Sequence, residues 1–538
     1  MNLILLKKYK KIRMSDMEKN SKFYTLKGLS SIISAILQQF SLFPLFMMSN
    51  IIPFMISYLY HLEKESSPEN ISSIRQRDGY FIHPFMSLFM SIFCFFGGII
   101  GHFLGPRMVI LLGGILIAIG DLLFVISKNL ILDFFINIFF GIGFAISMTA
   151  SVKNACKYFP QRRGLINALA GGFGGNLGSS AFNLVIKLFV SKGDYPRPYD
   201  NNMYIKSTAE NYKLFFYIHA GVSFGFGLLS SLLLFPYENI QEKKNFSSMI
   251  EQNNNIDRLP ENINEEINRN NSELKKRNYK EDLKLILSHY RIYYLLGIFL
   301  FTSFLQGFIL TVGFNFGTMQ HGDNNQNKIG GDEMSIIFML MSLVSCFIGP
   351  VFGTIYDKLG FKKTMIILNS LSVLNGSLIF FTVRLGVIFY GISIILNGCL
   401  NSGAFSMIFP YVSKIFGFNY AGELYGIVVL SVGISSIMSS SIYYVFSKVI
   451  KTENDLSYLF IFIVGIIMNI ISIVMIFYEK EDVFSFYRVN FLQEKGFLDE
   501  KKKQKSKNNN NDINESDDGD SDNIYELEDK ATTDIEGQ

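Results

Sequence analysis

Polar side chains that lie inside long apolar segments are the residues of this sequence best placed to do chemistry. Asn397 and Asn401 stand at i and i+4, so on a helix they share one face. Amides and hydroxyls donate and accept hydrogen bonds, but they do not neutralise a full charge. Together these groups predict a water-accessible path for a solute, whereas each alone could bond to the backbone of a neighbouring helix. The other members of the set are Gln38, Asn50, Asn137, Thr149 and Gln306.

Ionisable side chains are rare in the apolar segments. Asp121 lies inside one of them, where a carboxylate either takes up a proton, which could couple transport to protons, or lies near the outer membrane interface. Lys153 ends another segment, where it could attract an anion or extend to the lipid headgroups. His219 and Lys187 are expected to be ordinary interfacial residues.

The sequence contains no pattern typical of an enzyme. It has no nucleotide-binding motif, no metal-ligand cluster and no nucleophile–base arrangement, so we expect no catalytic residue, no metal and no cofactor. The cysteines lie in or at the ends of apolar segments without CxxC spacing, which predicts small apolar residues and no disulfide framework. They are Cys94, Cys156, Cys346 and Cys399.

The elements that position these residues are apolar segments long enough to cross a membrane. The chain has 538 residues, 49% hydrophobic and 17% charged, which is too apolar for a soluble enzyme of this length. A helix of about 20 residues crosses a hydrocarbon core of about 30 Å. Twelve such segments predict an all-α membrane protein with twelve transmembrane helices, the first interrupted by Pro44 and Pro53. They are approximately 28–60, 82–103, 107–127, 130–152, 164–190, 213–236, 292–314, 334–356, 363–382, 386–412, 420–447 and 456–478.

Charge and composition divide the chain further. Basic residues gather in the N-terminal arm, at Lys157–Arg163 and at Lys358–Lys363, which predicts that both termini are cytosolic. This topology accounts for the net charge of +4, so no nucleic-acid partner is expected. The predicted parts are a basic arm at 1–27, a six-helix bundle at 28–236, a flexible cytosolic linker at 237–291, a second six-helix bundle at 292–478 and a cytosolic tail at 479–538, disordered from about 500.

A short motif occurs once in each half, after the second and the eighth apolar segment. Glycines in it allow a very short turn between two helices, and its basic residues hold the turn at the headgroups. The repeat predicts two pseudo-symmetric six-helix bundles related by an axis along the membrane normal. Its residues are Gly98, His102, Gly105 and Arg107 in the first copy and Gly353, Asp357, Lys358, Gly360, Lys362 and Lys363 in the second.

The second copy resembles the signature turn of the major facilitator superfamily, G-x(3)-D-[RK]-x-G-x-[RK]-[RK]. In that family the acid and the basic pair help to latch the cytosolic gate. The first copy departs from the pattern, because His102 stands where the aspartate would be. The resemblance implies a secondary carrier, an antiporter or a symporter, that works by alternating access.

The segment "KYFPQRRGLINALAGGFGGNLGSSAFN" raises two possibilities, a phosphate-binding loop or a helix that packs closely on another helix. A phosphate loop needs a preceding strand, and the flanking residues are apolar at helical spacing instead. We therefore expect small residues on one helix face, as in small-xxx-small packing of transmembrane helices. They are Gly164, Ala168, Gly171, Gly175 and Gly178.

The same segment, together with "FGFNYAGELYGIVVLSVGISS" at Phe416–Ser436, resembles the oxalate/formate antiporter and monocarboxylate transporter branch of the superfamily. Members of the branch commonly place an arginine in the eighth helix, and some add a lysine in the eleventh. The corresponding positions fall near Gly349 and Val432, which carry no charge. The residues that match the branch are Tyr158, Phe159, Arg162, Arg163, Gly171, Gly175 and Gly178.

Three functions remain open from the sequence. The branch resemblance implies transport of a small organic anion, similar to a monocarboxylate. The amides and the missing arginine favour a neutral or zwitterionic solute, such as an amino acid. A membrane receptor or scaffold that does not transport is the alternative from another class. The expected partners are a small solute, a coupling proton and the lipid bilayer, with the protein as a monomer.

Overall fold

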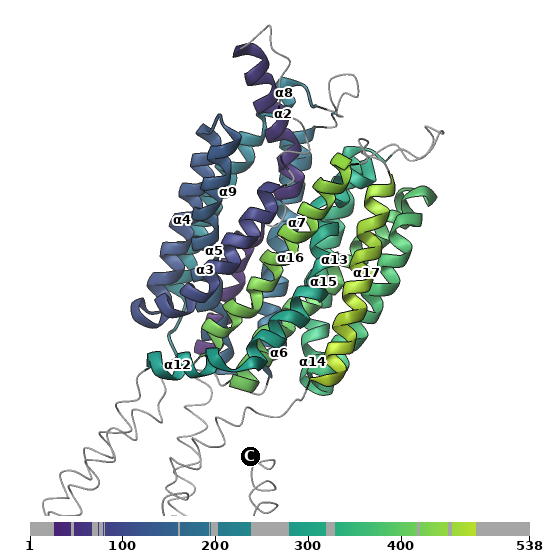
Figure 1. The fold of residues 1–538 in the computed structure, drawn as a ribbon. Helices are drawn as coiled ribbons and strands as arrows, with labels where there is room; N and C mark the ends of the chain where they lie inside the picture. The colour runs from purple at the N-terminus through teal and green to yellow at the C-terminus, as the bar shows by residue number, and fades with distance from the viewer. Residues whose placement is uncertain are drawn as a thin grey trace, which may run out of the picture. The chain divides into compact units, whose positions relative to one another are not determined.

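The structure is a computed structural model in which almost every described residue is helical (Figure 1). One compact unit, Met1–Glu481, contains all of these residues. Most of the predicted N-terminal arm, most of the predicted linker and the tail after residue 479 lie outside the described residues. Those described are 26–44, 48–66, 74, 79, 81–159, 162–192, 194, 203–237, 279–318, 329–416, 420–449 and 455–479.

The helices follow the predicted apolar segments closely. The first half comprises helical residues 26–42, α2 (Met48–Ser66), α3 (Ile82–Leu104), α4 (Pro106–Ile126), α5 (Leu130–Tyr158), α6 (Arg163–Asn167), η4 (Ala168–Phe173), α7 (Gly174–Val185), η5 (Ile186–Ser191), α8 (Lys206–Glu210) and α9 (Tyr212–Leu233). The second half comprises α12 (Tyr279–Ser288), α13 (Tyr290–Thr318), α14 (Gly331–Thr382), η8 (Val383–Leu385), α15 (Val387–Phe416), α16 (Ala421–Val449) and α17 (Asp455–Tyr478).

Nine helical segments of the described residues are each long and apolar enough to cross a membrane. One of them contains α14, which bends at Gly360 (φ 78°, ψ 175°) and so makes two crossings. Two further crossings are interrupted: the first (26–44 and 48–66) and the fifth (α6, η4, α7 and η5). With these, the described part of the chain supplies the twelve predicted transmembrane helices. The all-α, two-bundle membrane fold is confirmed.

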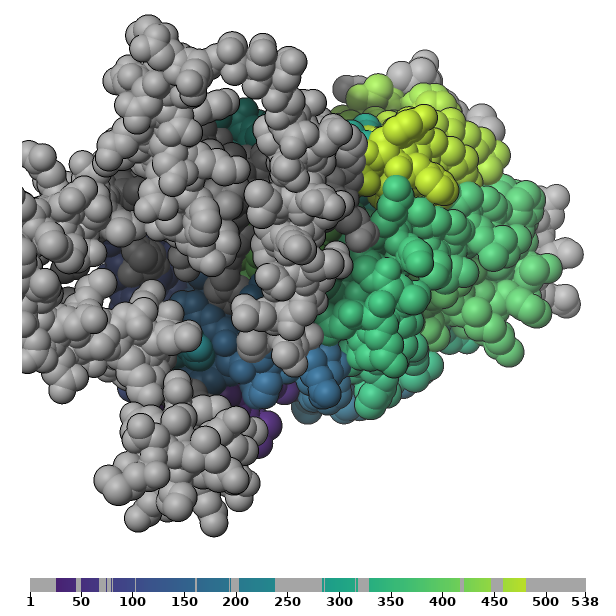
Figure 2. Space-filling view, turned by 90° about the horizontal axis from the view of Figure 1, so that it is seen from below, coloured from purple at the N-terminus to yellow at the C-terminus, as the bar shows by residue number. Residues whose placement is uncertain are grey.

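The two halves contact each other through matching crossings. The second crossing, α3, packs on the eleventh, α16, and the fifth crossing packs on the eighth, which is the first part of α14. Each half also has its own apolar core, and the four cysteines are buried and form no disulfide. Figure 2 shows the purple and blue residues of the first half and the green and yellow residues of the second half on different sides of the molecule.

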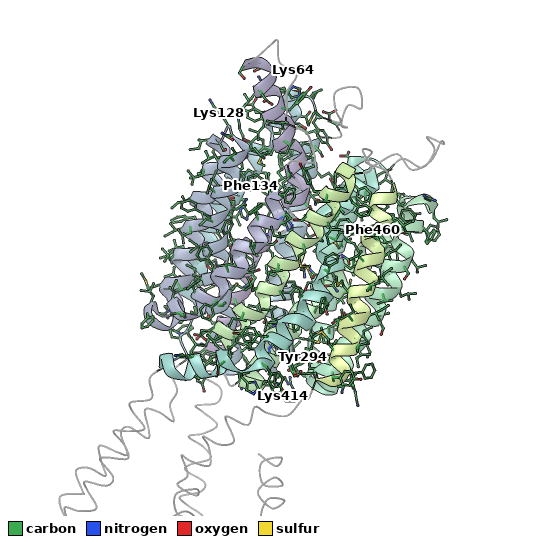
Figure 3. All side chains as sticks on the ribbon, in the orientation of Figure 1. Lys64, Lys128, Phe134, Tyr294, Lys414 and Phe460 are labelled. Atoms are coloured by element: carbon green, nitrogen blue, oxygen red, sulfur yellow. The ribbon has the colours of Figure 1, made fainter. Side chains whose placement is uncertain are left out.

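One end of the helices carries the basic turns. We call it the basic end; it holds Gly105, Gly360 and the last turn of α15 with Lys414, and it is the lower end in Figure 1. The opposite end holds Lys64 and Lys128 (Figure 3). The helices alternate in direction between the two ends, as transmembrane crossings must.

The two copies of the repeated motif have the same backbone form. Gly105 and Gly360 adopt φ of 76° and 78°, a region that favours glycine, so each permits a sharp turn between two helices. The basic residues that follow also act alike. Arg107 donates to the Leu234 carbonyl at 2.7 Å, where α9 ends, and Lys362 donates to the Phe477 carbonyl at 2.6 Å, in the last turn of α17. Cations stabilise helix C-termini in this way.

The end of the predicted linker differs from expectation. Residues Tyr279–Ser288 form the helix α12 directly before α13, where we predicted flexible chain up to 291. Leu283 and Ile286 stand at i and i+3 and are buried. An apolar face at this spacing stabilises a helix by packing, even though the segment is polar on average.

Candidate transport cavity and gate

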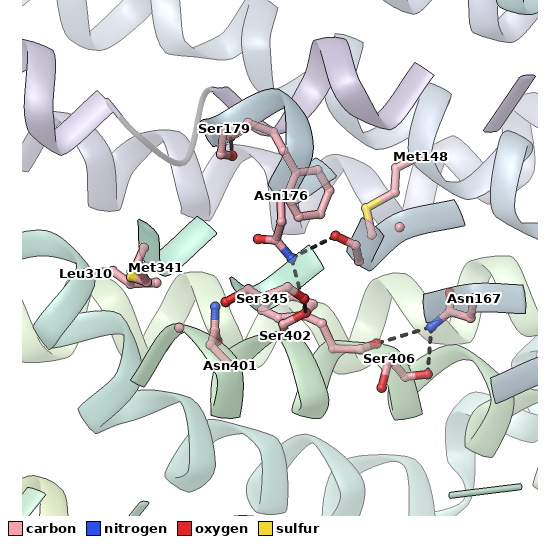
Figure 4. Close-up of a pocket in the computed structure, with 15 residues that line it drawn as sticks. Met148, Asn167, Asn176, Ser179, Leu310, Met341, Ser345, Asn401, Ser402 and Ser406 are labelled. Carbon is pink, nitrogen blue, oxygen red and sulfur yellow. Dashed lines mark hydrogen bonds between the residues drawn. The ribbon is translucent and has the colours of Figure 1, made fainter. Parts of the chain in front are cut away.

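A cavity of about 50 Å³ lies between the two halves, near the middle of the helices. This volume holds at most a few water molecules. Figure 4 shows residues of the fifth crossing on one side and residues of α14 and α15 on the other. The lining residues are Phe43, Met148, Asn167, Gly171, Gly172, Asn176, Ser179, Leu310, Met341, Ser345, Gly398, Asn401, Ser402, Phe405 and Ser406.

The amides of the fifth crossing use their donors on protein atoms. The Asn176 amide nitrogen donates to the Gly172 carbonyl at 2.7 Å and to the Ser402 hydroxyl at 3.1 Å (Figure 4). The Asn167 amide nitrogen donates to the carbonyls of Phe405 and Ser406, at 3.3 and 2.8 Å. These bonds consume both amide protons in each case, so the oxygen atoms remain to meet a solute.

Three serine hydroxyls of the lining also donate hydrogen bonds to protein carbonyls. Ser179 donates to the Phe43 carbonyl at 3.1 Å, and Ser402 donates to the Ser345 carbonyl at 3.4 Å. Ser406 donates to the Gly403 carbonyl at 2.7 Å. Within the described residues, Asn401 is the lining amide without a hydrogen bond. The cavity therefore presents mainly acceptor oxygens, together with the free NH₂ group of Asn401.

The wall beside the cavity leaves no room for a long side chain at Gly349. A Cβ at this glycine would lie 2.7 Å from the Ser402 hydroxyl oxygen and 3.8 Å from the Gly172 Cα. The sequence comparison with the monocarboxylate branch placed its arginine near Gly349. A side chain at Gly349 would have to displace the Ser402 hydroxyl and would approach the backbone of Gly172.

The glycines of the fifth crossing serve two faces, where we predicted one. Gly175 and Gly178 pack against Phe43 and Phe40 of the first crossing, whereas Gly164 packs against Gly353 of α14. Gly171 has open space beside it and lines the cavity. The π-helical turn η4 lies between Gly164 and the later glycines and shifts the register of the face.

Most of the predicted path residues lie away from this cavity. Asn401 lines it, but Asn397 donates to the Gln306 carbonyl at 3.5 Å. The others satisfy the neighbouring backbone or are buried in their own half. Thr149 donates to Ala145, Asn137 donates to Asp133, Asn50 donates to Asn183, and the amides of Gln38 and Gln306 are buried without a described partner.

Most of the polar residues that line the cavity were not predicted from the sequence. The predicted residues lie on the first, fourth, seventh and tenth crossings, whereas the polar lining residues come from the fifth, eighth and tenth crossings. The signal was present, because Asn176 and Ser179 interrupt a glycine-rich helix with polar groups at i and i+3. The missed residues are Asn167, Asn176, Ser179, Ser345, Ser402 and Ser406.

The second motif closes the basic end between the halves. The Asp357 carboxylate accepts hydrogen bonds from the backbone N–H groups of Gly164 and Leu165, each at 3.0 Å. An anion at a helix N-terminus is stabilised by these donors and by the helix dipole. Arg163 adds a bond to the Ser413 hydroxyl of α15 at 3.3 Å. The fifth crossing is thereby tied to the second half.

The first motif closes the same end with a different carboxylate. Gly98 lies against α16, where a Cβ would stand 2.7 Å from the Glu423 backbone nitrogen. Glu423, in the first turn of α16, lies 3.9 Å from the Lys153 ammonium of α5. His102 occupies the place of the motif aspartate, and its side chain is outside the described part of the structure. Glu423 and Lys153 thus place an acid and a base between α16 and α5 at this end.

Other residues of the branch motif also lie at the basic end. The Tyr158 hydroxyl donates to the Phe235 carbonyl at 3.2 Å, and Phe159 packs against Gly28. Arg162 precedes α6.

The opposite end is closed as well. The Ser191 hydroxyl donates to Asp332 at 3.3 Å, between the fifth and eighth crossings. Phe81 and Tyr444 meet edge to face, with ring centroids 5.4 Å apart, between the second and eleventh crossings. The halves touch at both ends, and we call this arrangement the occluded conformation.

Asp121 and His219 form a buried pair, which corrects the expected interfacial position of His219. Both side chains have no exposed surface, and His219 Nδ1 lies 2.9 and 2.8 Å from the two carboxylate oxygens of Asp121. Nε2 lies 2.9 Å from the Ser41 carbonyl oxygen. The sequence could not pair these residues because 98 positions separate them. Lys187 is half-buried on η5.

Comparison with known proteins identifies the family. The family model of the Major Facilitator Superfamily matches residues 39–440. No curated protein matches the chain. Among solved structures, the nucleoside transporter NupG is similar with a TM-score of 0.55 at 12% identity, over 83% of this chain and 99% of that one. The proton:xylose symporter XylE, bound to 6-bromo-6-deoxy-D-glucose, has a TM-score of 0.55 at 13% identity, over 85% of this chain and 96% of that one. The chain belongs to the Major Facilitator Superfamily and is an integral, multi-pass membrane protein of a transporter family.

Proposed function

We propose that this protein carries a small uncharged solute that is rich in hydrogen-bond donors, by alternating access of a site between its two halves. The observation that carries the proposal is the acceptor-rich lining of the cavity. The amide N–H groups of Asn167 and Asn176 donate to protein acceptors, so their amide oxygens are available to accept from hydroxyl or amine groups of a solute. A polyhydroxylated solute satisfies such a wall, because each hydroxyl brings a proton.

The same lining argues against the organic anion that the branch resemblance implied. A carboxylate needs donors or a cation, and none of the lining residues is charged. The arginine position of the branch falls near Gly349, which carries no charge and where even a methyl group would meet Ser402. A zwitterion would need a partner for its carboxylate too, and among the described lining amides only that of Asn401 donates no hydrogen bond to the protein.

The solved relatives carry a nucleoside and a xylose, which are neutral and polyhydroxylated. At 12–13% identity they support the fold alone, so the proposal rests on the cavity. The basic turns favour an orientation with the basic end in the cytosol, because Lys and Arg are retained on that side. A monomer contains the whole cavity, since both halves belong to one chain.

The test is flux into proteoliposomes that contain the purified full-length protein. The probes are radiolabelled xylose, mannitol, uridine and lactate, with unlabelled lactate as an anionic competitor and glycine as a zwitterionic one. We expect saturable uptake of at least one neutral probe, without inhibition by lactate. Saturable uptake of lactate alone would overturn the proposal, and binding of a probe without flux would indicate a receptor.

A further inference from the structure

The hydrogen-bond geometry of the Asp121–His219 pair determines how many protons the pair binds. Both ring nitrogens of His219 face acceptors: Nδ1 faces the Asp121 carboxyl group at 2.8 Å, and Nε2 faces the Ser41 carbonyl at 2.9 Å. A carbonyl oxygen can only accept, so the Nε2 contact requires a proton on Nε2. The Nδ1 contact requires a second proton, either on Nδ1 or on the carboxyl group. The pair therefore holds two protons and is neutral as a unit.

The surroundings make loss of one of these protons costly. Both side chains are fully buried, and the rings of Phe182 and Phe215 lie with centroids 5.0 and 5.9 Å from the imidazole. An aspartate with a neutral histidine would leave a net negative charge in this apolar setting. The pair is thus built to keep its proton in the occluded conformation.

No described hydrogen bond or ion pair joins another ionisable side chain to the pair. The packed elements carry such residues elsewhere: Tyr212, Lys213 and Tyr217 on α9, Asp133 on α5, Lys187 on η5, and Lys27 and Arg107 at the basic end. Lys213 donates to Glu210 and Tyr58, and Tyr212 donates to the Phe124 carbonyl. The proton count of the pair is therefore set by Asp121, His219 and Ser41.

Ser41 connects this pair to the cavity. It lies at the end of the helical residues 26–42, directly before a 3-10 turn at Phe43 and Pro44. Proline has no N–H, so the regular helix hydrogen bonding is interrupted here, and the Ser41 carbonyl lies 2.9 Å from His219 Nε2. Phe43, two residues on, lines the cavity and also accepts a bond from Ser179 through its carbonyl. The hydrogen bond from His219 Nε2 to the Ser41 carbonyl thus joins α9 to the first crossing next to its interruption.

We propose that Asp121 and His219 form a proton-binding site that couples the proposed solute transport to protons through the break in the first crossing. When one proton leaves to water, the remaining ring proton stays on Nδ1, bonded to the carboxylate. Nε2 then presents a lone pair to the Ser41 carbonyl, and that bond is lost. Release of Ser41 removes one of the contacts that hold the segment before Phe43, which lines the cavity wall. The inference rests on the proposed function for the coupling, but the proton site can be tested without a solute.

The first experiment is ¹⁵N NMR of histidine-labelled full-length protein in nanodiscs, as the pH is raised. The chain has six histidines, and the His219 signals are assigned by their loss in His219→Gln. We expect Nε2 of His219 to be protonated at low pH and to lose its proton at high pH. In Asp121→Asn the amide can donate to Nδ1 and so fixes the proton on Nε2, which should then remain at every pH. A wild-type Nε2 that never changes, or one that changes equally in Asp121→Asn, overturns the proposal.

The second experiment measures uptake of the neutral probes by proteoliposomes under an imposed pH gradient. One proton per solute allows up to about tenfold accumulation for each pH unit. We expect Asp121→Asn to lose this accumulation while exchange at equal pH continues, and Asp133→Asn, a matched buried carboxylate on α5, to retain it. If accumulation under the pH gradient is lost in Asp133→Asn but retained in Asp121→Asn, the coupling role of Asp121 and His219 is overturned. Absence of all neutral flux, with normal NMR titration of His219, overturns the proposed solute class and leaves the proton site standing.

Discussion

Gly353 and Gly164 touch through their backbones across the two halves: a Cβ on Gly353 would lie 2.5 Å from the Gly164 carbonyl oxygen. The contact lies at the basic end, beside the Asp357 latch. Both residues must be glycine for the fifth and eighth crossings to close in this way. The contact joins the repeated motif to the glycine-rich helix, which the sequence alone presented as separate features.

Gly353→Ala tests this contact. The added methyl group must push the crossings apart, which costs on the order of 1–3 kcal/mol in the occluded conformation, as overpacking of a tight interface does. We expect a lower rate of probe exchange in proteoliposomes and greater labelling of a cysteine introduced near the basic end. Gly225→Ala is the matched control, because a Cβ at Gly225 meets nothing within 4 Å. Equal behaviour of the two variants would show that the closeness of Gly353 and Gly164 has no role in closure.

The Asp357 carboxylate provides a second test of the same gate. It accepts from two backbone N–H groups at the start of α6, like an N-cap residue on another helix. Asp357→Ala removes both bonds and should destabilise the closed basic end by about 0.5–2 kcal/mol. Asp357→Asn keeps one acceptor oxygen and should have an intermediate effect. We expect labelling of a cysteine at the basic end to increase from the wild type to Asp357→Asn and then to Asp357→Ala. Greater labelling of Asp357→Asn than of Asp357→Ala would contradict the role of the two hydrogen bonds.

Local patterns were sufficient for most of the fold. The helices follow the apolar segments, and the glycine spacing of the repeated motif predicted two turns that have nearly the same φ. These features depend on neighbours in the chain. The bend at Gly360 inside α14 and the interruption at Pro44 were likewise visible as a glycine and a proline.

The site was less predictable because its contacts join distant parts of the chain. Asn176 bonds to Ser402, 226 positions away, and the sequence offers no rule that pairs them. The π-helical turn at η4 also redirects the glycine face, so a constant helical period placed Gly171 and Gly178 on one surface when they serve different neighbours. The approach of Glu423 to Lys153 likewise joins distant parts of the chain, so the sequence did not predict it.

Lys153 and Glu423 are expected to act as a coupled pair. Glu423 is fully buried, and the Lys153 ammonium lies 3.9 Å from its carboxylate. Replacing one partner leaves the other charge buried, desolvated and unpaired. This lowers the stability of the fold more than replacing both partners does. We therefore expect Lys153→Met to lower the midpoint of thermal unfolding in detergent more than the double variant Lys153→Met/Glu423→Gln. Additive effects of the two single substitutions would show that the pair contributes no coupling energy.

Asn401 and Asn397 share a helix face, but only Asn401 lines the cavity, so the two should separate binding from packing. Asn401 has the free amide donors, and removal of a group that hydrogen-bonds a solute costs about 1–3 kcal/mol, or roughly ten- to hundredfold in apparent affinity. Asn401→Ala should therefore raise the KM for the transported neutral probe with little change in thermal stability. Asn397→Ala loses its bond to the Gln306 carbonyl and should lower stability while the KM is kept. If Asn397→Ala instead raises the KM as much as Asn401→Ala does, the solute meets the whole face of α15, and the site extends beyond the cavity seen in the occluded conformation.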